Sequence, residues 1–295
     1  MTKVDFPPSD WQALGGVAPD ALVETRIQLH WAVQVVGAVP LAVLEQAPDF
    51  SHANLGWIAE DAAFVTRQVG ASPPVRVGLD LLNFDLTVRD AADGVVDTLR
   101  LEGKTLDDGY GWIAEMMGRY GVGDVAPEDL HRPDQDFPDH VVRAGAPFTG
   151  GEAVARAELA HWYDNTLLLL STVVRDYDNA SPVRTWPHHF DMATLITLES
   201  AEDPEEMRSV GVGMVPGDVS YPEPYLYATP WPVPASPDMF PRLEGGGTWH
   251  TEGWVGAVLT GSTLVVAGDD PVAQAEQAQA FLASAIPAAC EIAGG

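Results

Sequence analysis

The sequence runs twice through the same order of elements: a helix, several short strands and a second helix. In the first half, residues 21–36 carry apolar side chains at helical spacing, with Gly37 and Pro40 expected to end the helix. Residues 75–88 alternate between apolar and polar or small residues, the pattern of a half-buried strand. Asp93-Gly94 predicts a tight turn into a hairpin partner, and Thr105 begins a capping box for a helix through Tyr120.

The second half repeats this order after residue 151. A helix is predicted from Glu152 to about Asp176, and a final helix from Asp270-Pro271 through Ala289. Between them the alternation of apolar residues predicts strands at 183–197, 209–215, 225–229 and 254–259.

A shift of 131 positions aligns parts of the two halves. It places Leu29-His30-Trp31 on Ala160-His161-Trp162, and with two residues added it places Asp85 on Asp218. We therefore predict an α+β fold with antiparallel sheets and flanking helices, built from two similar α-β-β-β-β-α halves by internal duplication. The alternative is chance agreement between amphipathic helices and β meanders.

The predicted organisation has three parts. Residues 1–125 form the first half, the Pro- and Asp-rich residues 126–150 form a linker, and residues 151–295 form the second half. The second half contains a segment rich in Pro, Gly and aromatic residues at 216–247, which we expect to pack as an ordered flap. Such a flap can form a ligand wall or can simply cover apolar surface.

The charge balance restricts the possible partners. The chain has 43 acidic and 15 basic residues, a formal net charge of −28, and only two of the basic residues are lysines. This charge would repel nucleic acid and an anionic membrane surface, so we expect neither as a partner. Neutral or cationic small molecules, metal ions and other proteins remain, and the acidity can also serve solubility alone.

The sequence lacks the motifs of several cellular locations and reaction classes. One cysteine, Cys290, allows no intrachain disulfide, and its predicted helix offers no nearby basic residue to activate the thiol. The N-terminal residues lack a signal-peptide pattern and no apolar run is long enough to span a membrane, so a cytoplasmic location is expected. The sequence has no phosphate-binding loop and no nucleophile elbow.

Two short segments combine histidines with acids at alternating positions. In an extended Trp186–Asp191 segment, His189 and Asp191 share one face, whereas His188 and Phe190 share the other. In Trp249-His250-Thr251-Glu252, the side chains of His250 and Glu252 also share a face. If the two strands are neighbours, the four side chains could hold zinc, manganese or iron. A structural hydrogen-bonded pair is the alternative for each segment.

Two further residues are candidates for ligand binding. His161 lies on the second long helix, and the equivalent His30 suggests that both histidines are hydrogen-bonded core residues. Glu223 lies between Pro222 and Pro224 in the predicted flap, where it could bind a cation or remain a solvated carboxylate.

The sequence resembles the DUF 5996 family, a bacterial domain of unknown function. The resemblance rests on Leu29-His30-Trp31 with Gln34 and Gly37, on Ser181-Pro182 followed by Phe190-Asp191-Met192-Ala193, and on Pro216-Gly217-Asp218 with Pro222-Glu223-Pro224. It covers most of the chain, and His188-His189 stand where that family has Gly-Ser. The resemblance implies no activity.

These patterns predict a pocket between sheet and flap that binds a small ligand or a divalent metal. Trp186, Tyr225 and Trp249 would form its walls, with His188, Glu223 and His161 as further ligand-binding candidates. A metal with an open coordination position would allow hydrolysis by an activated water. The alternative is a non-catalytic structural or protein-interaction module that displays the flap as a flat aromatic patch.

Overall fold

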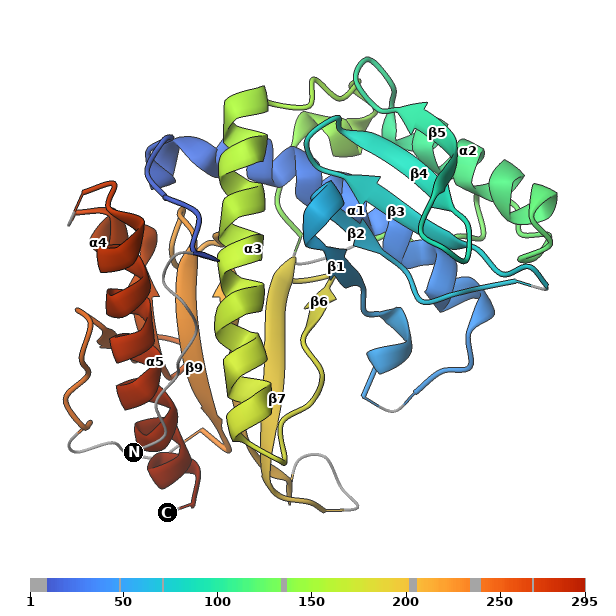
Figure 1. Ribbon diagram of the computed structural model, residues 1–295. Coiled ribbons are helices and arrows are strands. Elements are labelled where there is room, and N and C mark those ends of the chain that lie inside the picture. The colour runs from blue at the N-terminus through green and yellow to red at the C-terminus, as the bar shows by residue number, and fades with distance from the viewer. Residues whose placement is uncertain are drawn as a thin grey trace. The chain divides into compact units, whose positions relative to one another are not determined.

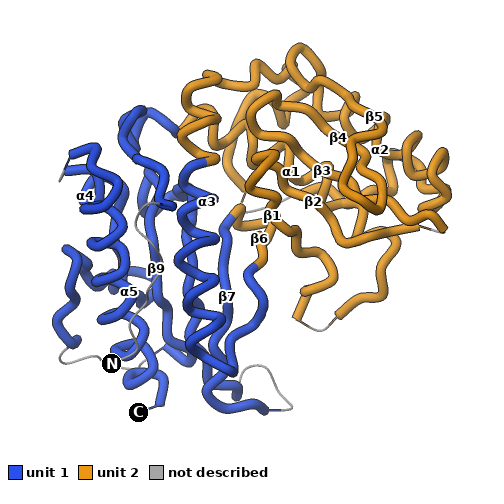
Figure 2. Tube along the Cα trace, in the orientation of Figure 1, with its two compact units in different colours: residues 1–22, 161–183, 191–295 blue, residues 23–160, 184–190 orange. Residues whose placement is uncertain are grey.

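The chain folds into two compact units. The computed structural model describes residues 10–47, 49–70, 72–133, 137–201, 206–233, 240–266 and 268–294 (Figure 1). Unit 1 comprises residues 1–22, 161–183 and 191–295, and unit 2 comprises residues 23–160 and 184–190 (Figure 2). The predicted linker at 126–150 belongs to unit 2 in this division.

Unit 2 contains a five-stranded antiparallel sheet whose strands follow one another in sequence order, β1-β2-β3-β4-β5. The helix α1 packs against β3 of this sheet and against the helix α2. The bounds are α1 (Val23–Val43), β1 (Gly56–Ile58), β2 (Ala63–Val65), β3 (Arg76–Asp80), β4 (Asp85–Arg89), β5 (Val95–Arg100), α2 (Leu106–Arg119) and β6 (Arg184–Trp186).

The helix α1 runs one to two turns further than the sequence predicts. Gly37 and Pro40 lie inside it, and every residue from Gln28 to Pro40 is buried. A proline costs a helix one backbone hydrogen bond, but only a single turn follows Pro40. Tertiary packing around a fully buried helix outweighs that cost, so the local stop signals fail here.

The sequence signals for turns and helix caps predict the structure better than the helix stop signals do. Thr105 caps α2 with the predicted capping box, since its side chain accepts from Asp108 N and Asp108 accepts from Thr105 N. The predicted Asp93-Gly94 turn joins β4 to β5, with Asp93 at φ 64°. The single strand predicted at 75–88 is instead two strands, because residues 81–84 turn with Phe84 at φ 59°.

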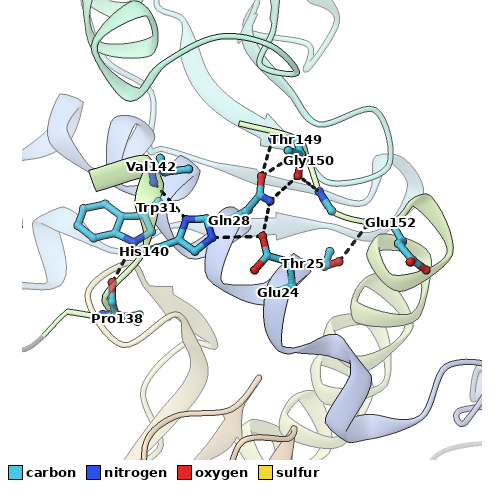
Figure 3. Close-up of polar contacts among 11 residues, drawn as sticks. Glu24, Thr25, Gln28, Trp31, Pro138, His140, Val142, Thr149, Gly150 and Glu152 are labelled. Atoms are coloured by element: carbon cyan, nitrogen blue, oxygen red, sulfur yellow. Dashed lines mark hydrogen bonds and ion pairs between the residues drawn. The ribbon is translucent and has the colours of Figure 1, made fainter. Parts of the chain in front are cut away.

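The segment from 137 to 152 is tied to the first turns of α1 (Figure 3). Gln28 Oε1 accepts hydrogen bonds from Thr149 N at 2.9 Å and from Gly150 N at 2.8 Å. Its Nε2 donates to Glu24 Oε1 and to Thr149 Oγ1, both at 2.6 Å. Further along the helix, Trp31 Nε1 donates to Pro138 O at 3.1 Å. Part of the predicted linker is therefore ordered against a helix, and its residues 134–136 lie outside the described residues.

Unit 1 contains strands β7 to β11 in the order β10-β11-β9-β8-β7, all antiparallel. The terminal helix α5 packs on β8, β9 and β11, and it runs beside β9 in Figure 1. The helix α3 begins in unit 2 and ends in unit 1. The bounds are α3 (Ala153–Asp176), β7 (Asp191–Glu199), β8 (Arg208–Val215), β9 (Tyr225–Trp231), β10 (Thr248–His250), β11 (Gly256–Thr260), α4 (Gly261–Val265) and α5 (Pro271–Gly294).

The centre of the predicted flap is a strand. Residues 225–231 form β9, which pairs with β8 on one side and with β11 on the other. Pro230 is tolerated because the pairing with β11 ends at Ala228, before the proline is reached. Residues 234–239 of the predicted flap lie outside the described residues.

The fold is α+β with antiparallel sheets and helices, as predicted. Both halves of the chain repeat the order helix, strands, helix, but the sheet orders differ because β11 rather than β10 is the neighbour of β9. Internal duplication therefore stays a prediction. Over the described ranges, no helix combines the length and the apolar character needed to cross a membrane.

Candidate functional site

A cavity of about 550 Å³ lies in unit 2. It is lined by residues from α1, from the segment that includes the 3₁₀ turn Ser51–Ala53, from the loop after α2 and from the turn after β6: Gln34, Gly37, Leu41, Phe50, Ala53, His131, Trp186, Pro187 and His188. A second hollow of about 570 Å³ has the consecutive residues 242–246 of unit 1 as its described lining. Ligand pockets are walled by several segments with few polar groups, so the first cavity is the stronger candidate.

One face of α1 forms a wall of this cavity. Gln34, Gly37 and Leu41 follow one another at intervals of three and four residues, which places them on the same side of the helix. Gly37 is needed for close packing, because a Cβ atom there would lie 3.0 Å from two side-chain carbons of Pro187. The turn that carries Pro187 can therefore rest directly on the helix backbone.

The residues after β6 form a tight turn, not the extended strand predicted from the sequence. Trp186 O accepts hydrogen bonds from His189 N at 3.2 Å and from Phe190 N at 2.7 Å. Phe190 has the left-handed conformation, φ 58°, and is fully buried. Before the turn, Thr185 exchanges two backbone hydrogen bonds with Leu55, at 2.8 and 2.9 Å. A bulky residue is strained at positive φ, so the surrounding packing must hold it in place.

The turn is fastened to α1 by two buried polar side chains. His30 Nε2 lies 3.0 Å from Pro187 O and 3.2 Å from His188 O, and Gln34 Nε2 donates to Pro187 O at 2.6 Å. Because carbonyl oxygens only accept, Nε2 of His30 must carry the proton. The ring of His30 lies between Phe137 and Phe190, at centroid distances of 4.3 and 5.3 Å. Burial lowers the pKa of His30 to about 3, assisted by the nearby charge of Arg26, so the ring is neutral at pH 7.

His131 is positioned on the cavity wall from the side of α2. Tyr110, a buried residue of α2, donates from its hydroxyl to His131 O at 3.1 Å. The guanidinium of Arg132 lies 4.1 Å from the centre of the Tyr110 ring and also contacts Asp107 at 2.5 Å. These contacts fix the backbone on both sides of the imidazole while leaving the imidazole exposed.

Phe50 is a further lining residue of the cavity. Its side chain is 54% exposed and its backbone has φ 55°, the left-handed region again. An exposed aromatic residue in a strained conformation is costly for stability alone, and such residues concentrate at binding sites.

Two of the predicted site residues, Trp186 and His188, line this cavity. His189 follows in the same turn, and the rings of His188 and His189 lie 4.2 Å apart. Partial removal from water lowers the pKa of His188, and the neighbouring His189 imidazole lowers it further. His188 is therefore a neutral imidazole at pH 7.

Asp191 begins β7 and has a tyrosine partner. Tyr227 of β9 donates to Asp191 Oδ2 at 2.6 Å, reaching past Gly213 of the intervening strand β8. A Cβ atom on Gly213 would lie 2.7 Å from the Tyr227 hydroxyl, so the glycine makes room for this contact. Burial raises the pKa of Tyr227 well above its ordinary value, and the charge of Asp191 adds to the effect. The prediction that His189 and Asp191 share one extended strand is wrong, because His189 lies in the turn and Asp191 begins β7.

The other predicted residues of unit 1 make structural hydrogen bonds. His250 contacts Tyr221 through Nδ1 at 3.0 Å and Glu252 O through Nε2 at 2.8 Å. Glu223 accepts from Ser262 N at 2.5 Å, and Tyr225 donates to Asp218 at 2.8 Å. Trp249 donates to Pro241 O at 2.8 Å and stacks on Phe240 with centroids 4.6 Å apart. Glu252 meets His250 through its backbone, not through its carboxylate.

The equivalence of His30 and His161 does not extend to their contacts. His161 is partly exposed and its Nδ1 atom is buried with no hydrogen-bond partner among the described residues. The hydrogen-bonded core role predicted for both histidines is confirmed for His30 only.

In the described part of the chain, no group of three or more His, Cys, Asp or Glu side chains is placed to hold a metal ion. Asp191, His250 and Glu252 are among the residues searched, and the first two hydrogen-bond to different tyrosines. Within the described residues, His189, Asp191, His250 and Glu252 therefore do not form the metal-binding group that the sequence predicts.

The sequence patterns do not predict most of the residues that line the cavity as site residues. Gln34 and Gly37 belong to a motif that resembles the DUF 5996 family, and Gly37 is expected to end the helix, but neither residue is predicted as a site residue; their spacing along one helix face is the available signal. His131 and Phe50 carry no local pattern that points to a site.

Comparison of the chain with protein-family models gives no match. Comparisons with curated proteins and with solved structures give no match either.

Proposed function

We propose that this protein binds a small, largely apolar molecule in the cavity lined by α1 and the turn after β6. The observation that carries the proposal is the cavity itself, whose volume of about 550 Å³ lies in the range of known ligand sites, about 300–1,000 Å³. Apolar and aromatic side chains provide most of its wall, and Gln34, His131 and His188 provide a few polar groups. This is the composition expected of a small-molecule site.

Binding is favoured over a reaction by the side chains present. Among the described lining residues, none carries a hydroxyl, thiol, amine or carboxylate that could act as a nucleophile or a strong acid. The two imidazoles have no carboxylate partner on the wall to orient them as general bases.

We also propose that the chain is a member of the DUF 5996 family. Four residues of the shared motifs meet in unit 2: His30 and Gln34 hold the turn, Gly37 packs beneath Pro187, and Phe190 stacks on His30. Gln34 and Gly37 line the cavity, and His30 and Phe190 pack against the turn that carries Pro187 and His188, which supports a shared binding role for the family.

A fluorescent probe tests the proposal. Dansyl N-pentyl sulfonamide is neutral and has about 20 non-hydrogen atoms, which at roughly 0.3 kcal/mol per atom corresponds to about 6 kcal/mol and a Kd of about 0.04 mM. We expect its emission to rise and shift to the blue on binding. Ala53→Trp should weaken binding about 10-fold or more, because the indole would occupy the space of the ligand.

Ala91→Trp is the matched control, since Ala91 is exposed and lies in the turn between β4 and β5. It should bind the probe as the unaltered protein does. Equal affinity of the Ala53→Trp and unaltered proteins would place the probe elsewhere and overturn the proposal. So would a lack of probe binding at millimolar protein concentration.

A further inference from the structure

We infer that the cavity selects ligands whose polar end is an organic amine and discriminates against carboxylates and phosphates. This inference rests on the proposed function and adds the chemical class of the ligand. It follows from the hydrogen-bonding capacity of the wall and from the charges around it.

Gln34 can offer a ligand only an acceptor. Its amide nitrogen donates to His30 O at 2.9 Å and to Pro187 O at 2.6 Å. Both partners are carbonyl oxygens, which fixes the orientation of the amide and uses both of its N–H groups. Its oxygen has no partner among the described residues, so it can accept a hydrogen bond from a ligand but cannot satisfy an anion.

The two imidazoles of the wall add acceptors, and the lowered pKa of His188 keeps that ring uncharged at pH 7. The side chains of His131 and His188 make no hydrogen bond within the described residues, and a neutral imidazole always presents one acceptor nitrogen. An ammonium group has three N–H donors, and the wall offers it three acceptor groups. The rings of Trp186 and Phe50 add faces that attract a cation.

Two guanidinium groups near the cavity are already engaged by protein groups. Arg132 contacts Asp107 and the Tyr110 ring, and Arg67 donates to Ser51 O and Asn54 Oδ1, so the contacts of both guanidinium groups are with protein. Asp49 precedes Phe50 on the rim and adds a negative charge there. The whole chain carries a net charge of −28, which attracts cations and repels anions.

Three dansyl sulfonamides with the same chromophore and nearly the same chain test the inference. They are dansylcadaverine, which ends in an ammonium group, the neutral N-pentyl analogue, and dansyl-6-aminohexanoate, which ends in a carboxylate. At 0.15 M NaCl we expect the ammonium probe to bind about 10-fold more tightly than the carboxylate probe, with the neutral probe between them. The order should persist at 0.5 M NaCl, because contacts within a cavity are screened less than attraction to an exposed surface.

Two histidine variants locate the selectivity. His188→Ala should reduce the preference for the ammonium probe about threefold, whereas His189→Ala should leave it unchanged, since His189 is adjacent but does not line the cavity. Ala53→Trp should weaken all three probes.

The possible failures are distinct. If the probes bind equally, or the carboxylate binds best, and Ala53→Trp weakens all of them, the inference fails while the proposed function stands. A preference for the ammonium probe that vanishes at 0.5 M NaCl, or that is unchanged in Ala53→Trp, reflects attraction to the protein surface. Either result also overturns the inference. If no probe shows binding sensitive to Ala53→Trp, both the inference and the proposed function are overturned.

Discussion

His30 shows how one buried side chain can hold a cavity wall and make the fold sensitive to acid. Its Nε2 proton is shared between two carbonyl oxygens of the turn after β6, and its ring lies between two phenylalanine rings. A protonated His30 ring would be a cation among apolar side chains, and none of its hydrogen-bond and ring-contact partners among the described residues has a carboxylate to balance the charge. Neutral His30 is therefore part of the geometry of the site.

The pKa of His30 predicts a loss of stability in acid. Burial lowers this pKa to about 3 from an ordinary value of 6.5, so below pH 6.5 the unfolded chain binds a proton that the folded chain rejects. The stability that His30 contributes is complete above pH 6.5 and declines as the pH falls toward 3, by up to about 1.4 kcal/mol per pH unit. The free energy of unfolding, measured by urea titration at pH 7.5, 6 and 5, should show this decline.

His30→Gln isolates the contribution of His30 from that of the many carboxylates. A glutamine can place an N–H donor near the position of Nε2 and does not titrate. The unaltered protein should therefore lose more free energy of unfolding than His30→Gln as the pH falls, and the difference in stability between the two proteins should narrow. Parallel pH profiles of His30→Gln and the unaltered protein would show that His30 is not the group responsible.

At the scale of elements, α1 is the framework of unit 2, and buried glutamines attach the chain to it and to α5. Gln28 makes three hydrogen bonds that fasten residues 149–150 to the first turns of α1, and a fourth to Glu24 of the same helix (Figure 3). In unit 1, Gln274 of α5 fastens Leu14 through both its backbone N and O, at 2.9 and 2.8 Å. Neither attachment follows a sequence pattern, because Thr149 and Leu14 are more than 100 residues away from the glutamines that hold them.

The elements that the sequence predicts correctly are those determined by neighbouring residues. The Thr105 capping box and the Asp93-Gly94 turn depend on contacts within a few positions, and both are present. The continuation of α1 through Pro40 and the turn at 187–190 depend on packing between distant segments, and the sequence pattern predicts neither. The cavity combines four such segments, so the sequence predicts only Trp186 and His188 among its lining residues as site residues.

Gln28→Ala should lower the free energy of unfolding by about 2–3 kcal/mol. Gln28 is 1% exposed, and its removal leaves the buried Gly150 N–H without an acceptor in addition to creating a cavity. Gln28→Glu should also destabilise the fold at pH 7, because a carboxylate would lie against Glu24 in place of an N–H donor, and protonation near pH 4 should restore part of the loss.

Gln68→Ala is the matched control for these measurements, since Gln68 is exposed. Its effect should stay within about 0.5 kcal/mol. A Gln28→Ala protein as stable as the control would mean that the attachment of residues 149–150 does not contribute to folding.

For the whole molecule, the dominant physical quantity is its charge. With 43 acidic and 15 basic residues, at least 43 − 15 = 28 carboxylates have no basic side chain to pair with one to one. Ion pairs such as Arg119 with Asp97, at 3.1 Å, therefore relieve only part of the repulsion. The folded state brings these charges closer together than the unfolded chain does, so self-repulsion opposes folding.

This repulsion predicts that salt stabilises the protein. Raising NaCl from 10 to 500 mM shortens the screening length from about 30 Å to a few ångströms, and the melting temperature should rise by about 2–4 °C for each kcal/mol of repulsion removed.

The same measurement with MgCl2, MnCl2 and ZnCl2 at matched ionic strength separates screening from binding, because a bound cation stabilises in proportion to the logarithm of its concentration above Kd. Screening alone gives similar shifts for all four salts. A larger shift at micromolar zinc or manganese that His250→Ala removes would contradict this prediction and would support the metal site predicted from His189, Asp191, His250 and Glu252.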